Sequence, residues 1–192
     1  MSHSSLPANH CLTAQRDRSR LVFVDLQVKL SGVMDSDAMQ KVSRNCSILA
    51  QAASLLDIPQ VYTEQYPRGL GHTLPELKAL LSTAACVEKT AFACSDEPAF
   101  NRQLTADHPQ IILAGMEAHI CILQTALGLQ AQGKQVFVVA DAVISRDPAN
   151  KANALDRLRQ AGIILTNTES VVFEWLAVGE GDAFRQISKL IR

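Results

Sequence analysis

Short, unbroken apolar runs are the feature that most constrains the fold of this chain. The clearest are residues 21–24 and 136–140, and each is followed directly by an aspartate, Asp25 or Asp141. Runs this short without polar alternation are typical of inner strands of a parallel sheet, which helices cover on both faces. Because such sheets bind ligands beyond the carboxyl ends of their strands, Asp25 is predicted to stand at a ligand-binding edge. The alternative is a capping or turn aspartate, which is common after strands.

Segments of helical period separate these runs. Strands are predicted at residues 21–24, 60–63, 86–88, 111–114, 136–140 and 163–165, and helices at 39–56, 74–81, 97–104, 122–131, 148–158, around 172–175 and after 182. Thr166 and Glu169 have capping-box spacing ahead of the helix that carries Trp175. Strands that alternate with helices along the chain predict an open parallel α/β sheet with helices on both faces.

Composition limits the partners and the number of domains. The chain has 192 residues, 47% of them hydrophobic, and a formal net charge of −1, which offers no field for nucleic acid or for an acidic membrane surface. We expect residues 1–18 to be a flexible N-terminal tail and residues 19–192 to form a single domain. The helix at 122–131 is apolar on more than one side, which favours a subunit interface.

Targeting signals and cysteine usage indicate the compartment. No apolar run approaches the roughly 20 residues that cross a membrane, and the first residues lack the apolar region of a signal peptide. The five cysteines include no Cys-x-x-Cys pair, which argues against a disulfide framework and against a zinc knuckle. The expected location is therefore the cytoplasm.

A strand-to-helix turn carries the most chemically suggestive residue. Residues 115–121 connect the apolar run 111–114 to the helical segment that follows, so Cys121 falls at a helix start. The helix dipole there lowers the pKa of a thiol, and the backbone N–H groups of Ala118 and Cys121 can hold an oxyanion. The alternative is a small buried residue that fills the helix start.

Two further residues fall just past strands at the same predicted edge. Asp25 follows the first strand and Lys89 follows the third, so a carboxylate, an ammonium and the Cys121 thiol are expected to meet. In this hypothesis Asp25 takes the thiol proton, Lys89 stabilises negative charge, and Cys121 attacks a carbonyl carbon. The candidate pocket residues are Gln27, Gln65, Tyr66, Phe92 and His119. Exposed loop positions, a core phenylalanine and a hydrogen-bonded turn histidine are the alternatives for them.

Three segments resemble the catalytic motifs of the isochorismatase-like cysteine hydrolases, in the same order. They are residues 21–27, 87–92 and 115–121, and the likeness continues at 124–127 and 138–142. It covers about residues 20–175 and is greatest for the isochorismatase domain-containing branch. The resemblance implies an Asp25–Lys89–Cys121 triad on a Rossmann-like, mainly parallel six-stranded sheet of order 3-2-1-4-5-6. It also implies acyl transfer from an amide or related C–N bond to the thiol, and a non-proline cis peptide between Glu117 and Ala118.

The chain departs from the family pattern at the metal site of nicotinamidases. Those enzymes carry an Asp-x-His motif and further histidines after the second strand, whereas this chain has Thr63 to Tyr66 there and a lone His72. A single histidine does not make a metal site, so no metal and no cofactor are expected. Glu117 and Ala118 also differ from the hydrophobic-then-Thr pair of other branches, which alters the pocket floor. True isochorismatases cleave a vinyl ether without a nucleophilic cysteine, so the family name does not predict the reaction.

The leading hypothesis is a metal-free cysteine hydrolase acting on a small amide or related acyl compound. One alternative is a non-catalytic homo-oligomeric binding or scaffold protein, and another is a peroxide sensor in which Cys94 resolves an oxidised Cys121. The expected partners are a small-molecule substrate and other copies of this chain, in a dimer or tetramer.

Overall fold

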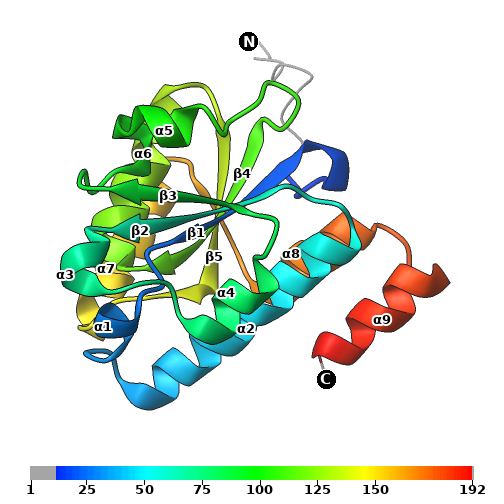
Figure 1. Ribbon diagram of the computed structural model, residues 1–192. Helices are drawn as coiled ribbons and strands as arrows, with labels where there is room; N and C mark the ends of the chain where they lie inside the picture. The colour runs from blue at the N-terminus through cyan, green and yellow to red at the C-terminus, as the bar shows by residue number, and fades with distance from the viewer. Residues whose placement is uncertain (1–11, 192) are drawn as a thin grey trace, which may run out of the picture.

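The computed structural model describes residues 12–191 and contains one six-stranded parallel sheet (Figure 1). Its strand order is β3-β2-β1-β4-β5-β6, which confirms the expected order 3-2-1-4-5-6. The strands are β1 (Ser19–Val24), β2 (Gln60–Gln65), β3 (Ala85–Lys89), β4 (Gln110–Met116), β5 (Gln135–Ile144) and β6 (Ile164–Thr166). All of these strands pair in parallel, so their carboxyl ends lie at one edge of the sheet.

Nine α-helices connect and cover the strands of the described region. They are α1 (Val28–Ser31), α2 (Ser36–Leu55), α3 (Pro67–Leu70), α4 (Pro75–Leu80), α5 (Pro98–Asn101), α6 (Leu123–Ala131), α7 (Pro148–Gln160), α8 (Thr168–Leu176) and α9 (Gly181–Ile191). Asp35 and Asp147 cap α2 and α7 by accepting backbone N–H bonds. The cap of α8 is Asn167, not the expected Thr166, because the Asn167 carboxamide accepts the Ser170 N–H at 2.8 Å.

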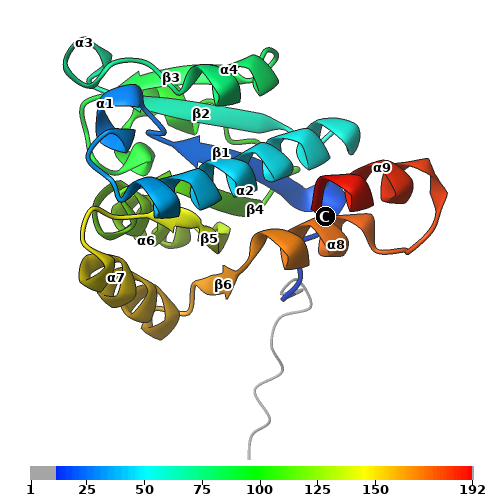
Figure 2. The same cartoon turned by 90° about the horizontal axis from the view of Figure 1, so that it is seen from below.

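The helices divide between the two faces of the sheet (Figures 1 and 2). On one face α2, α4, α8 and α9 bury a core that includes Phe23, Leu49 and Trp175. On the other face α5, α6 and α7 bury a second core that includes Phe100 and Leu158. Both faces of β1 and β4 are therefore covered, as their continuous apolar sequences predict.

Three sequence expectations need adjustment. Residues 12–18 were expected in a loose tail, yet Ala14 is buried and its N–H donates to Glu174 at 2.7 Å, since this segment packs along α8; residues 1–11 lie outside the described region. Strand β5 continues past Asp141 to Ile144. The apolar helix α6 packs on β5, on α7 and on the 3-10 turn η2 (Cys94–Asp96). Contacts within a single copy of the chain therefore bury much of its apolar surface.

One glycine lets two central strands approach each other beside the site. Gly115 pairs with Val24 across β1 and β4 and has a φ of 129°. A Cβ at this position would lie 2.1 Å from the Val24 carbonyl oxygen, so only glycine fits. This close approach places the start of the Cys121 turn next to the residue that follows Val24, which is Asp25.

No helix of residues 12–191 is both long enough and apolar enough to span a bilayer.

Candidate active site

Asp25 follows β1 in a left-handed backbone conformation with a φ of 53° and is fully buried. Thr63, at the carboxyl end of the neighbouring strand β2, fixes it from both sides. The Thr63 hydroxyl donates to Asp25 Oδ1 at 2.6 Å, and the Asp25 N–H donates to the Thr63 carbonyl at 3.2 Å. The carboxylate is thus held in one orientation, with its second oxygen directed elsewhere.

That second oxygen accepts a hydrogen bond from Lys89. The distance from Lys89 Nζ to Asp25 Oδ2 is 2.7 Å, and neither side chain has exposed surface. Burial opposes the charge of Lys89, but the Asp25 carboxylate more than offsets burial, so the pKa of Lys89 is raised. Lys89 therefore stays an ammonium at neutral pH.

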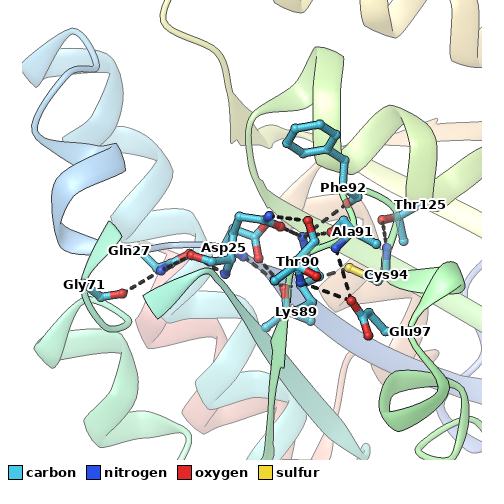
Figure 3. A network of polar contacts seen from close by, with 12 residues as sticks. Asp25, Gln27, Gly71, Lys89, Thr90, Ala91, Phe92, Cys94, Glu97 and Thr125 are labelled. Carbon is cyan, nitrogen blue, oxygen red and sulfur yellow. Dashed lines mark hydrogen bonds and ion pairs between the residues drawn. The ribbon is translucent and has the colours of Figure 1, made fainter. Parts of the chain in front are cut away.

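The ammonium is surrounded by oxygen acceptors from one loop and one side chain (Figure 3). Gln65 Oε1 accepts at 2.6 Å, and the carbonyls of Ala91 and Phe92 accept at 3.2 Å each. The carboxylate of Glu97 accepts the N–H groups of Thr90 and Ala91, which holds this loop around the lysine. These contacts fix Lys89 in position. A lysine at the end of a strand is usually solvated instead.

Gln27 and Gln65 were predicted as pocket residues, and the structure gives both a structural role. The Gln27 carboxamide is buried and donates to the carbonyls of Gln65 and Gly71 at 3.0 and 2.6 Å. Both of its amide hydrogens are thus bound by protein. Gln65 bridges Lys89 and the Thr90 carbonyl, to which its Nε2 donates at 2.8 Å. These two residues tie the loops around the ion pair together.

Cys121 lies in a π-helical turn, η3 (Ala118–Ile122), which leads from β4 into α6. Both Ile120 and Ile122 donate their N–H groups to the Glu117 carbonyl, which defines the turn. The cis peptide joins Met116 to Glu117 and not Glu117 to Ala118 as expected. Strand β4 continues through Met116, so the cis bond lies at the junction of strand and turn, one residue earlier than the resemblance implied.

The thiol of Cys121 faces Asp25 in a nearly closed environment. Its residue is only 6% exposed, and the thiol makes a hydrogen bond with Asp25. Burial, the charge of Asp25 and this hydrogen bond raise the pKa of Cys121, while the charge of Lys89 opposes them. The prediction that the helix start lowers this pKa is wrong, because burial and a neighbouring carboxylate outweigh the dipole. The resting state is a neutral thiol next to its base.

A second thiol lies close to the same groups. Cys94 is fully buried, its N–H donates to Thr125 Oγ1 at 2.8 Å, and its Sγ lies 3.9 Å from Thr63 Oγ1. Burial is the largest influence on its pKa, which is raised to about 11. Both thiols are therefore protonated at neutral pH, which removes the low pKa on which the peroxide-sensor hypothesis depended.

Glu117 and His119 brace the turn against the end of β5. The Glu117 carboxylate is buried and accepts the backbone N–H of Arg146 at 3.0 Å and its Nε–H at 3.3 Å. His119 Nδ1 and Ser145 Oγ are 2.9 Å apart, within hydrogen-bonding distance. His119 thus has the protein partner that its turn-histidine alternative requires.

Tyr66 and Phe92 stand at the outer side of the triad. Their exposed fractions are 56% and 54%, and Figure 3 shows the Phe92 ring pointing away from the lysine network. A cavity of about 380 Å³ is lined by Tyr66, Lys89 and five neighbouring residues. Of Asp25, Lys89 and Cys121, only Lys89 is among its lining residues, so Tyr66 is a wall of an opening beside the lysine.

The loop after β2 contains no metal-binding cluster within the described residues. Glu64, near the end of β2, accepts from Thr73 N and Oγ1 at 2.8 and 2.9 Å and lies 2.8 Å from His72 Nδ1. These bonds tie the loop to the end of the strand. The side chains of Glu64 and His72 thus have hydrogen-bonding partners within the protein.

Thr63 and Arg146 were not predicted from the sequence as site residues. Thr63 is the register partner of Val24, so the pairing of the two strands, once known, identifies it. Arg146 comes from the extension of the chain past β5, which the strand pattern did not predict.

The chain resembles proteins of known sequence along most of its length. The Isochorismatase domain model matches residues 19–170. An isochorismatase domain-containing protein 2 from Danio rerio is 38% identical over 174 residues, covering 90% of this chain and 86% of that protein. The secreted isochorismatase effector Isc1 of Phytophthora sojae is 36% identical over 181 residues, covering 91% and 85%.

Solved structures match over a similar extent. The MAR1 ribonuclease of Caenorhabditis elegans has a TM-score of 0.87 and 35% identity, covering 93% of this chain and 92% of that one. YcaC from Pseudomonas aeruginosa, solved with hexane-2,5-diol and covalent acrylamide, has a TM-score of 0.87 and 25% identity, covering 97% and 93%.

Proposed function

The chain belongs to the isochorismatase family, and on that premise we propose that it is a metal-free cysteine hydrolase. Its substrate is a small amide or a related C–N or acyl compound, which is cleaved through a thioester on Cys121. The observation that carries this proposal is the buried series of contacts from Lys89 to Asp25 to Cys121. A nucleophile, a base and a fixed cation in contact are the parts that acyl transfer needs.

The first step forms the thioester. The Cys121 thiol passes its proton to Asp25 while Sγ bonds to the carbonyl carbon, and the N–H groups of Ala118 and Cys121 receive the oxyanion. Collapse of the tetrahedral intermediate breaks the C–N bond, and the leaving nitrogen takes the proton from Asp25. Because the pKa of the Cys121 thiol is raised, the thiol keeps its proton until the bond between Sγ and the carbonyl carbon of the substrate begins to form.

The second step regenerates the thiol. A water molecule gives a proton to Asp25 and attacks the thioester carbonyl, and the C–S bond breaks. The thiolate then recovers the proton from Asp25, leaving a carboxylic acid product. Lys89 keeps its charge throughout, and its ammonium stays 2.7 Å from Asp25 Oδ2, where it stabilises negative charge on the carboxylate whenever Asp25 has given up the proton.

The neighbouring structures bear on this proposal in two ways. Acrylamide is an electrophile that bonds to thiols, and its covalent presence in YcaC makes it a suitable probe of Cys121. The ribonuclease name of the C. elegans protein raises RNA as a substrate. The formal net charge is −1 and Lys89 is buried in an ion pair, so the site has little positive charge to attract the phosphates of RNA. We therefore prefer a small neutral substrate, and we propose that the protein acts in the cytoplasm.

The test uses an activated ester followed by amides. The wild-type protein, Cys121→Ala and Asp25→Asn are mixed with p-nitrophenyl acetate, and intact mass is read for one added acetyl group. Of these three proteins, only the wild type is expected to be acetylated. Thr105→Val, a matched surface variant, is the control and is expected to behave like the wild type. Small primary amides are then screened by ammonia release. Equal acetylation of Cys121→Ala and the wild type would contradict the proposal and favour the homo-oligomeric scaffold.

A further inference from the structure

A second cavity lies on the other side of the Cys121 turn. Its volume is about 700 Å³, and it opens between the starts of α2 and α7 and the end of β5. Val42, Ile144 and Pro148 contribute apolar surface. None of Asp25, Lys89 and Cys121 lines it, so it is distinct from the opening beside Lys89.

Positive charge predominates around this cavity. Four cationic side chains line it against two carboxylates: Lys41, Arg44, Arg146 and Lys151 against Asp35 and Asp141. The carboxylates already serve the fold. Asp35 Oδ1 accepts the Ala38 N–H at 2.9 Å, and Asp141 Oδ1 accepts Thr168 N and Oγ1 at 2.8 Å each.

The two lysines have no such engagement. Within residues 12–191 neither Lys41 nor Lys151 makes a hydrogen bond or an ion pair. Lys151 is partly buried, and burial lowers its pKa although the charge of Asp141 opposes this effect. An ammonium that has lost part of its water and has gained no acceptor is stabilised by an anion that enters the cavity.

We propose that this cavity is a binding site for a small organic anion, a carboxylate or phosphate monoester with a compact apolar body. The anionic group binds Lys41 and Lys151, and the apolar part lies against Val42, Ile144 and Pro148. A volume of about 700 Å³ is in the range of small-molecule sites. Carboxylates and phosphates share this chemistry, and the test below separates them.

The site is connected to the catalytic turn through two residues of its own wall. Arg146 donates from N and Nε to Glu117, and Ser145 Oγ lies 2.9 Å from His119 Nδ1. Glu117 and His119 lie on either side of Ala118, which is a predicted oxyanion donor. A bound anion that attracts Arg146 changes the bracing of this turn, so occupancy is expected to alter the reactivity of Cys121.

Amide chemical shifts in ¹H–¹⁵N spectra test the proposal directly. The full chain is titrated with benzoate, with phenyl phosphate and with benzyl alcohol, which has the same ring without the charge. We expect saturable shifts at Ile144, Ser145 and Lys151 with at least one anion, and smaller linked shifts at Glu117 and His119. Whichever anion binds more tightly identifies the headgroup class.

Two variants make the test specific. Lys151→Met keeps the length of the side chain and removes its charge, and it is expected to weaken anion binding roughly tenfold, as the loss of a charged hydrogen bond does. Lys78→Met, an exposed position on α4, is expected to bind as the wild type does. Because the readout is binding, it does not depend on turnover by Cys121.

Three results would overturn the site. One is equal binding of benzyl alcohol and the anions, which would indicate an apolar crevice only. Another is unchanged affinity in Lys151→Met. The third is line broadening of the same amides with protein concentration and without ligand, which would show that a second copy of the chain covers the cavity.

Discussion

The Lys89 ammonium and the Asp25 carboxylate form an ion pair at 2.7 Å in which neither side chain has exposed surface. Each charge has further hydrogen bonds, from Thr63 to the carboxylate and from the ammonium to Gln65. A buried pair stabilises little by itself, but the loss of one member leaves the other as an uncompensated charge. The triad is therefore part of the fold as well as of the proposed chemistry.

Lys89→Met is expected to lower the free energy of unfolding by about 3–5 kcal/mol, the usual cost of breaking a buried pair. The double variant Asp25→Asn with Lys89→Met is expected to recover part of this loss, because it leaves no buried charge. Urea unfolding followed by circular dichroism measures both. Lys78→Met is the control on an exposed lysine, and a loss in Lys89→Met no larger than in this control would show that the pair is not a stabilising unit.

Gly115→Ala is expected to destabilise the protein by more than about 4 kcal/mol, at the severe end for single substitutions. The new methyl group would lie 2.1 Å from Val24 O and 2.7 Å from Val24 N, and the two strands cannot separate without opening the sheet. Gly133→Ala is the matched control. Its φ is 81°, but nothing lies within 4 Å, so only the left-handed conformation contributes, at about 1–2 kcal/mol. Soluble yield and urea midpoints separate the two, and equal losses would mean that the strands adjust.

The strand pattern was sufficient to predict the sheet and the meeting of Asp25, Lys89 and Cys121, because all three follow apolar runs that end at one edge. It could not predict Thr63, whose role depends on which strands are neighbours and in what register. The sequence also predicted a lowered pKa for the Cys121 thiol, whereas this pKa is raised. That direction depends on burial and on the hydrogen bond to Asp25, and both are properties of packing rather than of residue order.

The bracing residues show the same limit. Glu117 was noticed in the sequence because it departs from the family pattern, but its partner Arg146 is 29 residues away. Nothing in the local pattern connects them. The contact exists because β5 runs three residues beyond Asp141 and delivers Arg146 to the end of β4, where Met116 and Ile144 are register partners.

Thr63→Val is expected to slow acetylation of Cys121 by p-nitrophenyl acetate roughly tenfold to a hundredfold, since a hydrogen bond to a charged group is worth about 1.5–3 kcal/mol. Thr63 orients Asp25 and touches no substrate in this proposal, so it is a positioning residue. Thr63→Ser keeps the hydroxyl and is expected to restore most of the rate. Thr105→Val controls for the loss of a threonine elsewhere. Equal rates in the valine and serine variants would show that the hydroxyl is not what matters.

The pH dependence of Cys121 alkylation tests the electrostatics of the triad. In the wild type the pKa of the thiol is raised, so alkylation by acrylamide is expected to increase only above the free-thiol value of about 8.5. The charge of Asp25 raises this pKa and the charge of Lys89 lowers it. Asp25→Asn should therefore move the alkylation midpoint to lower pH, and Lys89→Met should move it to higher pH.

Peptide mass spectrometry measures these midpoints and supplies an internal control. Cys86 is exposed, and the charges that influence its pKa are Glu64, Lys78 and Glu88 rather than the triad. Its midpoint should be the same in all three proteins. At pH values below its own alkylation midpoint, where its thiol is still protonated, Asp25→Asn is expected to lose acetylation because the base that accepts the proton is gone. A wild-type midpoint well below that of a free thiol, or shifts of the same sign in both variants, would contradict the neutral resting state on which the proposed mechanism depends.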